Sequence, residues 1–158
     1  MKRVIVALVS ILFIVGCSRM EHPSPEIMKA DIGTYKLPHQ AKEGKAIVYI
    51  LRPETAQPSE NFYVYLDSVK PENKMGHTNG KQYIYFYVTP GKHTIYSDAE
   101  RIKSIDIQAK AGDVIFIEQE VVMGYFIADE ILHNDYDLLT GTYMMKSLSL
   151  GTIIKTEK

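Results

Sequence analysis

Cysteine is almost absent from this chain of 158 residues, because Cys17 is its only copy. A single cysteine excludes an internal disulfide and any metal site built from several thiolates. Tryptophan is absent too, whereas tyrosine occurs 11 times beside 5 phenylalanines. The hydrophobic fraction of 46% and the charged fraction of 23% are ordinary values for a folded protein, and the length suits one compact domain.

Charge of one sign is not concentrated anywhere beyond the first three residues. The formal net charge is -1, and acidic and basic residues are interspersed along the chain. A protein that binds nucleic acid needs a basic patch to neutralise phosphates. We therefore predict no nucleic-acid partner.

Recognisable catalytic motifs are also missing. The histidines are scattered outside any nucleophile elbow or HExxH motif; they are His22, His39, His77, His93 and His133. His93 follows the turn Pro90-Gly91, where we expect its ring to face solvent or to bond a backbone carbonyl. His77, His93 and Asp98 have no metal-ligand spacing, and Gly-rich phosphate motifs are absent. We predict no catalytic activity, no cofactor and no bound metal.

Three pairs of carboxylates remain as candidate acid/base groups, namely Glu118/Glu120, Asp129/Glu130 and Asp135/Asp137. Residues two apart in a strand share a face, so Glu118 and Glu120 can stand side by side as an acid/base pair. The alternative is a solvated face or a sheet edge, where charges deter aggregation. We favour this second interpretation.

The N-terminus has the pattern of an export signal. Lys2 and Arg3 precede an apolar run over residues 4–15, and the chain becomes polar after Cys17. About 12 apolar residues are too few for a membrane span, which needs about 20. Ile14-Val15-Gly16-Cys17 resembles the lipobox of bacterial lipoproteins. The resemblance implies that residues 1–16 are cleaved, that Cys17 carries the lipid, and that Ser18 directs the protein to an outer membrane.

Residues 17–43 are rich in proline and charge, with Pro23, Pro25 and Pro38 spread along them. No sustained period of 2 or 3.6 is present, so we expect a tether between lipid and domain. A short helix over residues 27–32, or packing of this segment on the domain edge, is the alternative. The domain is expected at residues 44–150, followed by a polar tail at residues 151–158.

Short apolar runs separated by turn residues predict an antiparallel β-sandwich. The expected strands cover residues 45–52, 62–66, 83–88, 93–96, 105–109, 114–118 and 125–128, with turn chemistry throughout residues 68–82. The first of these is apolar on both faces, as in a strand covered on both sides. After Ile131 the alternation is lost. Asp135 or Asp137 can cap a short C-terminal helix, although Gly141 would stand in its middle.

Tyrosine alternates with apolar residues on two of the expected strands, at Tyr63, Tyr65, Tyr83, Tyr85 and Tyr87. If the two strands are neighbours and in phase, these rings form one aromatic patch opposite Phe62, Val64, Ile84 and Phe86. Such a patch suits contacts with protein or with sugar rings. Cross-strand aromatic pairs also stabilise a sheet without any ligand, and both interpretations stay open.

The segments YVYLDS, YIYFYV, PGKHTIY, AKAG and FIEQEV, with Asn79-Gly80 and Met123-Gly124, together resemble the bacterial lipoprotein domain of unknown function 2846 over residues 44–150. The YLD and PGKH elements also resemble the PEGA-type module. These resemblances imply a transthyretin-like sandwich in the cell envelope and supply no activity.

We therefore expect a non-catalytic, lipid-anchored envelope protein that binds another envelope component or supports an assembly. The alternative is a glycan-binding or peptidoglycan-binding module that uses the tyrosine patch. An envelope hydrolase comes third.

Overall fold

The structure is a computed structural model that describes residues 22–53, 58–99, 101–122 and 130–157. Its helices are α1 (Pro25–Ile32) and α2 (Leu138–Met145), with a 3-10 helix η1 (Pro71–Asn73). Its strands are β1 (Ala46–Arg52), β2 (Phe62–Leu66), β3 (Lys74–Thr78), β4 (Gln82–Val88), β5 (Gly91–Asp98), β6 (Ile102–Ala109), β7 (Val114–Val122), β8 (Glu130–Tyr136), β9 (Ser149–Leu150) and β10 (Thr152–Ile153). The predicted signal, Cys17 and the strand expected at 125–128 lie outside the described residues.

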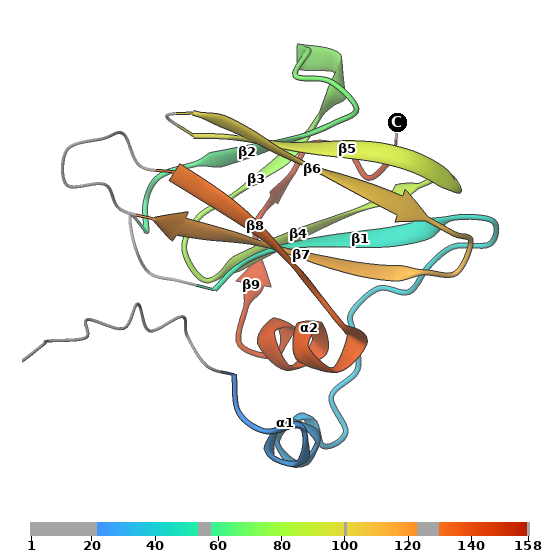
Figure 1. The fold of residues 1–158 in the computed structure, drawn as a ribbon, viewed down its shortest axis with the longest axis vertical. Coiled ribbons are helices and arrows are strands. Elements are labelled where there is room, and N and C mark those ends of the chain that lie inside the picture. Colours follow the sequence, from blue (N-terminus) through green and yellow to red (C-terminus); the bar gives the residue numbers. More distant parts are fainter. Residues whose placement is uncertain (1–21, 54–57, 100, 123–129, 158) are drawn as a thin grey trace, which may run out of the picture.

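Within the described residues, the strands form two packed five-stranded sheets, so the predicted β-sandwich is confirmed (Figure 1). Sheet A has the order β8-β7-β1-β4-β9, and sheet B has the order β10-β3-β2-β5-β6. Most strand pairs are antiparallel, as predicted, and two pairs are parallel. β1 pairs with β7 in parallel, and β9 pairs with β4 in parallel, because the chain returns to sheet A after visiting sheet B.

The inner core fills the space between the two sheets. Alternate residues of each strand point into it, including Val48 and Ile50 of β1, Val64 of β2 and Phe86 of β4. All seven residues of β1 are buried, which confirms that this strand is covered on both sides. Its other face belongs to a second group, the outer cluster, whose buried members are Ile47, Tyr49, Leu51, Tyr83, Tyr87, Phe116, Met144 and Met145.

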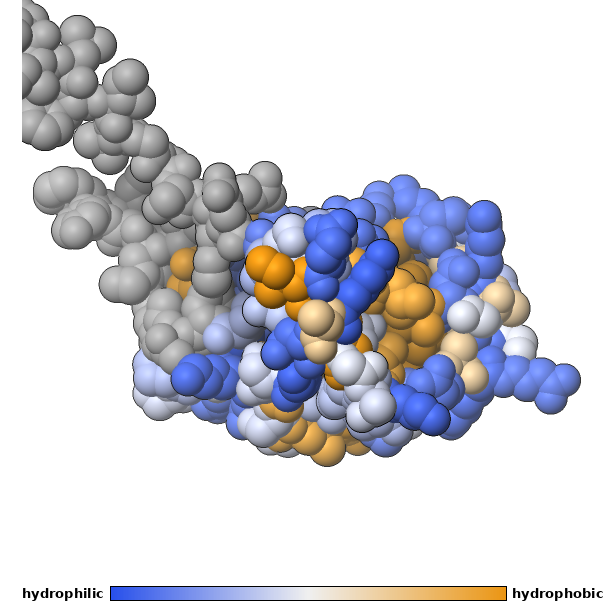
Figure 2. Space-filling view, turned by 90° about the horizontal axis from the view of Figure 1, so that it is seen from below, coloured by the Kyte–Doolittle hydropathy of each residue, from blue (hydrophilic) through white to orange (hydrophobic). Residues whose placement is uncertain are grey.

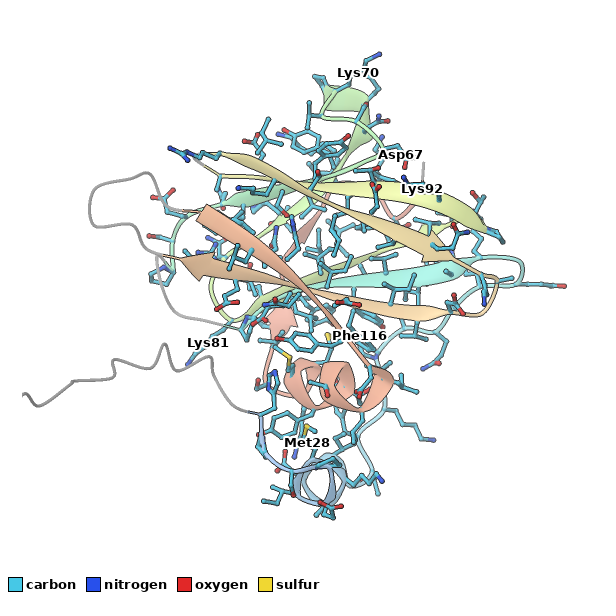
Figure 3. The ribbon with its side chains drawn as sticks, viewed as in Figure 1. Met28, Asp67, Lys70, Lys81, Lys92 and Phe116 are labelled. Atoms are coloured by element: carbon cyan, nitrogen blue, oxygen red, sulfur yellow. The ribbon has the colours of Figure 1, made fainter. Side chains whose placement is uncertain are left out.

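Helix α2 covers the outer face of sheet A, and α1 lies beyond it (Figure 1). Asp137 caps α2, because its Oδ1 accepts a hydrogen bond from the Thr140 amide at 2.7 Å. Gly141 lets the helix approach the sheet: a Cβ at this position would stand 2.2 Å from Cγ of Phe116 (Figure 3). The predicted C-terminal helix is confirmed, and its glycine has a packing reason.

The segment expected to be a tether packs on the domain from α1 onward. Met28 is 4% exposed and lies between α1 and α2 (Figure 3), and Tyr35, Leu37 and Ala41 pack against the outer cluster. The prediction of a tether over residues 17–43 is therefore wrong for this part, and the alternative of a short helix on the domain edge is confirmed. Tyr35, Leu37 and Ala41 each contact the outer cluster from an irregular part of the chain. Their spacing therefore follows neither the helical nor the strand period, and the sequence pattern did not reveal this packing.

The expected polar tail is also part of the fold. β9 pairs with β4 and β10 pairs with β3, so the chain crosses from sheet A to sheet B. The Thr156 carbonyl accepts from the Tyr87 amide at 2.7 Å. Glu157 forms ion pairs with Lys42 and Lys45. The hydrogen bonds from the two lysine side chains lower the pKa of the Glu157 carboxyl to about 2.

Four strands were not predicted from the sequence, namely β3, β8 and the two short strands β9 and β10. β3 lies in the segment 74–78 that was assigned to turns, and β8 lies where the apolar alternation fades. Both pair along their length with a neighbouring strand, β3 with β2 and β8 with β7. Backbone pairing therefore holds residues such as Lys74, His77 and Asn134 in strands that their own propensities do not favour.

No helix among the described residues is long and apolar enough to cross a membrane. Seen from the side of α1, the surface is largely hydrophilic with separate apolar areas between the charged side chains (Figure 2). Ile27 of α1 and Leu138 of α2 are among the exposed large apolar residues.

Candidate functional site

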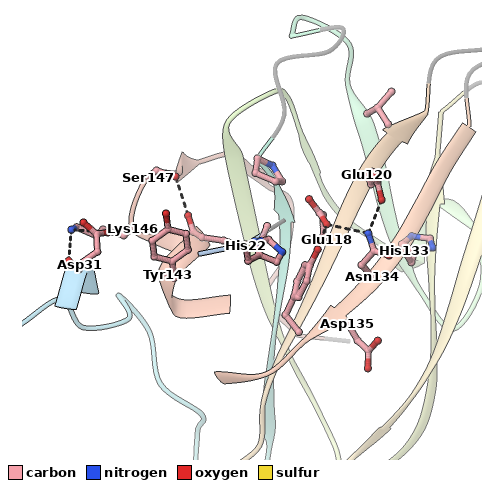
Figure 4. A pocket seen from close by; sticks show the side chains of 14 residues that line it. His22, Asp31, Glu118, Glu120, His133, Asn134, Asp135, Tyr143, Lys146 and Ser147 are labelled. Atoms are coloured by element: carbon pink, nitrogen blue, oxygen red, sulfur yellow. Dashed lines mark hydrogen bonds and ion pairs between the residues drawn. The ribbon is translucent and has the colours of Figure 1, made fainter. Parts of the chain in front are cut away.

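A cavity of about 880 Å³ lies beside the outer face of sheet A, where β7 and β8 extend past α2 (Figure 4). Strands β7 and β8, helices α1 and α2, and His22 all contribute to its lining. The outward residues of β7 are Phe116, Glu118 and Glu120, since Ile115 and Ile117 point into the inner core. Phe116 lies under α2, and the two carboxylates follow where the helix no longer covers the strand.

Glu118 and Glu120 are held by donors from β8 (Figure 4). The Asn134 Nδ2 donates to Glu118 Oε2 at 3.1 Å and to Glu120 Oε2 at 2.8 Å. The Tyr136 hydroxyl donates to Glu118 Oε2 at 2.5 Å. Because one amide nitrogen reaches both carboxylates, their Oε2 atoms lie within about 6 Å of each other.

This geometry corrects the favoured interpretation of the pair. β7 is an interior strand of sheet A, since β8 lies beyond it, and Glu118 is only 5% exposed. The side chains do share one face, as expected. The solvated edge was the wrong interpretation because β8, with its donors Asn134 and Tyr136, was not recognised as a strand. Residues 131–136 show no apolar alternation that would have identified this strand.

An ion pair between the two helices forms another part of the cavity wall (Figure 4). Lys146 Nζ lies 3.2 Å from Oδ2 of Asp31 and also donates to the Asp31 carbonyl at 2.5 Å. The His22 ring contacts the Tyr136 ring edge to face, with centroids 5.1 Å apart. Residues from the N-terminal segment therefore complete a cavity that the sandwich begins.

A polar network lies under the cavity and joins the two sheets. The Thr78 hydroxyl donates to Gln119 Oε1 at 2.6 Å, and Gln119 Nε2 donates to Ser97 Oγ at 2.7 Å. His133 Nε2 lies 2.7 Å from Ser97 Oγ. Burial lowers the pKa of His133 to about 4, so the ring is neutral at neutral pH and shares a hydrogen bond with the serine hydroxyl. Ser97 is fully buried, and we assign this serine and histidine a structural role.

The five tyrosines do not form one patch, so that prediction is wrong. Tyr63 and Tyr65 are on β2 in sheet B, whereas Tyr83, Tyr85 and Tyr87 are on β4 in sheet A. One patch required the two strands to be neighbours, but the chain passes through β3 in sheet B before it enters sheet A at β4. Each group of tyrosines therefore has its own surroundings.

The tyrosines of β4 are covered. Tyr83 is 7% exposed and Tyr87 is 8% exposed, and both belong to the outer cluster. Tyr85 stacks on the His39 ring with centroids 3.8 Å apart. On sheet B, Tyr65 is 7% exposed, and Lys74 Nζ lies 3.8 Å from the Tyr63 ring centroid. The glycan-binding hypothesis loses the common surface on which it was based.

The remaining histidine predictions have separate outcomes. His93 bonds a backbone carbonyl, as expected: its Nε2 lies 2.9 Å from the Thr89 oxygen, and its Nδ1 lies 3.1 Å from Asp67 Oδ1. Asp98 stands five residues along the same strand from His93, about 16 Å away. Within the described ranges, no group of three or more His, Cys, Asp or Glu side chains is placed to hold a metal ion.

A family model described as a protein of unknown function (DUF2846) matches residues 42–130, more than half of the chain. No curated protein matches the chain. The matched segment includes Glu118 and Glu120 and ends where β8 begins, so Asn134, Tyr136 and α2 follow it.

Proposed function

We propose that this chain, which belongs to the DUF2846 family of proteins of unknown function, is a non-catalytic envelope protein that binds another envelope component in the cavity beside β8. The observation that carries the proposal is Glu118, which is 5% exposed and lines a cavity of about 880 Å³. A concave site with a few placed polar groups is the usual form of a ligand site. The outer face of β4 is closed by the protein's own residues, which favours the cavity as the binding surface.

The proposal includes a lipid anchor on Cys17 and a location at the outer membrane. Its support is the lipobox-like sequence and the polar chain that follows it. His22 stands five residues after Cys17, and five extended residues span at most about 18 Å. Because His22 lines the cavity, the anchor would hold one wall of the cavity within that distance of the lipid. The transthyretin-like or PEGA-like relationship stays a prediction from the sequence.

The anchor is tested with Cys17→Ala in the native host. We expect the variant to keep residues 1–16 or to leave the membrane fraction, whereas the unaltered chain begins at a lipidated Cys17 by mass spectrometry. Normal processing and normal membrane fractionation of the variant would contradict lipid anchoring.

The cavity is tested by photo-crosslinking of the anchored full-length protein in its own membrane. A benzophenone side chain is placed at Tyr143, which lines the cavity, and in a second variant at Tyr96, on the outer face of sheet B. Both sites are partly exposed tyrosines, so they form a matched pair. We expect a discrete adduct at position 143 that is absent at position 96. The same adduct at both positions, or none at 143, would contradict a binding site in the cavity.

A hydrolase is the second candidate, and the separation of the two carboxylates favours it. A retaining glycosidase places its carboxyl groups about 5 to 5.5 Å apart. Here, however, both Oε2 atoms accept from the amide of Asn134, so the two side chains already share one donor of the protein. We expect no new reducing ends when the protein is incubated with peptidoglycan. Release of reducing ends that Glu118→Gln abolishes would make the protein an enzyme.

A further inference from the structure

The lining of the cavity is strongly acidic. Its ionisable groups other than histidine and tyrosine are Asp31, Glu118, Glu120, Asp135 and Lys146. Lys146 is engaged with Asp31 through its ion pair and through the Asp31 carbonyl. The wall formed by β7 and β8 therefore offers negative charge without a basic side chain from the cavity lining to balance it.

Glu118 has an unused acceptor in this wall. Its Oε2 accepts from Asn134 and Tyr136, whereas its Oε1 has no hydrogen-bond partner among the described residues. The side chain is 5% exposed and is turned toward the cavity beside Glu120 (Figure 4). A carboxylate that is largely removed from water is stabilised by a cation or by further donors. The two neutral donors act on Oε2, and Oε1 is left to accept from a group in the cavity.

Two carboxyl groups held within about 6 Å of each other repel when both carry a negative charge. Asn134 fixes both oxygens on one nitrogen and thus prevents the side chains from turning apart. A cation that enters between the free oxygens relieves the repulsion and fills the unused acceptor. Glu118 and Glu120 are therefore preorganised to bind a positive group. When no cation is bound, the two like charges are held close together.

We propose that the component bound in the cavity presents an ammonium or guanidinium group to Glu118 and Glu120, an inference that rests on the proposed binding function. Such groups carry several N–H donors and can bridge two carboxylates. Tyr136 and Tyr143 place aromatic rings in the same lining, which suits the apolar stem or the face of an organic cation. The pair lacks a third His, Cys, Asp or Glu ligand within the described ranges, which favours an organic cation over a chelated metal.

The inference is tested by calorimetric titration of the full-length protein in neutral detergent with three probes of equal chain length. The probes are 1,5-diaminopentane, 1,5-pentanediol and pentanedioate, which differ in charge but have the same carbon chain. We expect saturable binding of the diamine that weakens with added salt, and binding of the diol and the dianion at least tenfold weaker. Equal binding of the diamine and the diol would overturn the inference, because the charge would then contribute nothing.

Isosteric variants locate the cation. Glu120→Gln and the double variant Glu118→Gln/Glu120→Gln keep the acceptor for Asn134 and remove charge. We expect diamine affinity to fall at least tenfold in the double variant and less in the single one. Asp106→Asn, which removes an exposed carboxylate on sheet B, is the matched control and should bind normally. Undiminished binding in a double variant whose melting temperature is unchanged would overturn the inference, and the single variant provides the same test if the double one unfolds.

The outcome separates the two proposals. A crosslink at position 143 with no binding of the diamine would leave the cavity as the binding site and reject a cationic ligand. No crosslink at 143 and no binding of the diamine would reject both. Diamine binding that the Gln variants abolish, together with the crosslink, would support both.

Discussion

The outer faces of the two sheets carry the same alternation of tyrosine with apolar residues, yet they have different neighbours. On sheet A, the rings of Tyr83 and Tyr87 pack in the outer cluster with residues of α2 and with residues of the segment 35–41. On sheet B, Tyr63 is covered in part by the side chain of Lys74, which belongs to the adjacent strand. The same alternation of tyrosine with apolar residues therefore lies under a second apolar layer on sheet A and beside charged side chains on sheet B.

Alternation identifies a strand and its two faces but does not reveal what covers the second face. The cover of sheet A comes from residues 35–41 and from α2, and α1 packs on α2 in turn. Where that cover ends, the outward residues of β7 change from Phe116 to Glu118 and Glu120. The candidate site lies at this boundary.

The largest expected difference between the two faces is in the cost of losing one ring. Tyr83→Ala should lower the free energy of unfolding by about 3 to 5 kcal/mol, as for a large aromatic removed from a core. Tyr63→Ala should lower it by about 1 kcal/mol, because a cross-strand pair and one cation contact are lost. Urea denaturation of the two variants measures both values. Equal losses would show that the two faces do not differ as we describe.

Acid should act where the two sheets are joined, at His133. The pKa of this histidine is about 4 in the folded protein, below the value of about 6.5 in an unfolded chain. Between these values the unfolded state binds the extra proton, so stability is complete above pH 6.5 and falls as the pH decreases toward 4. The loss should approach about 3 kcal/mol.

The measurement is urea denaturation of the unaltered protein and of His133→Gln from pH 7 to pH 4. The glutamine keeps an acceptor for Ser97 but does not titrate, so its stability should change much less over this range. A curve for His133→Gln that parallels the curve of the unaltered protein would assign the acid sensitivity to another group.

Gly141→Ala tests how closely α2 must approach sheet A. The new methyl group would meet the Phe116 ring at 2.2 Å, so the helix or the ring must move. We expect a loss of about 1 to 3 kcal/mol in the free energy of unfolding, the usual cost of overpacking. Phe116→Leu should recover part of that loss when combined with Gly141→Ala. Strict additivity of the two changes would contradict direct contact.

The smallest expected effect concerns the N-terminal part of the cover. The Tyr49 hydroxyl donates to the His39 carbonyl at 2.7 Å and accepts from the His39 amide at 3.1 Å. Tyr49→Phe removes both bonds and should cost about 1 kcal/mol. Amide hydrogen exchange should accelerate in residues 35–41, while the amides of β5 serve as the internal reference. Unchanged exchange at 35–41 would show that this hydroxyl does not hold the segment.

Part of the fold was predictable because it depends on local pattern. Alternation identified β2 and β4, uninterrupted apolar runs identified β1 and β7, and Asp137 was one of two candidate caps for α2. β3 and β8 were not predictable in this way, because residues such as His77 and Asn134 are strand residues only through their partners. The carboxylate pair was noticed, but its donors lie on β8, so its burial could not be foreseen.

The sequence by itself determined the class of fold, the inward faces of the main strands and the C-terminal helix, because these follow from the spacing of apolar residues and from a capping side chain a few positions away. Tertiary structure alone decided which strands are neighbours, which tyrosines are covered, and that Glu118 and Glu120 meet Asn134 in a cavity. These outcomes depend on contacts between residues far apart in the chain, whose free energies no local pattern records.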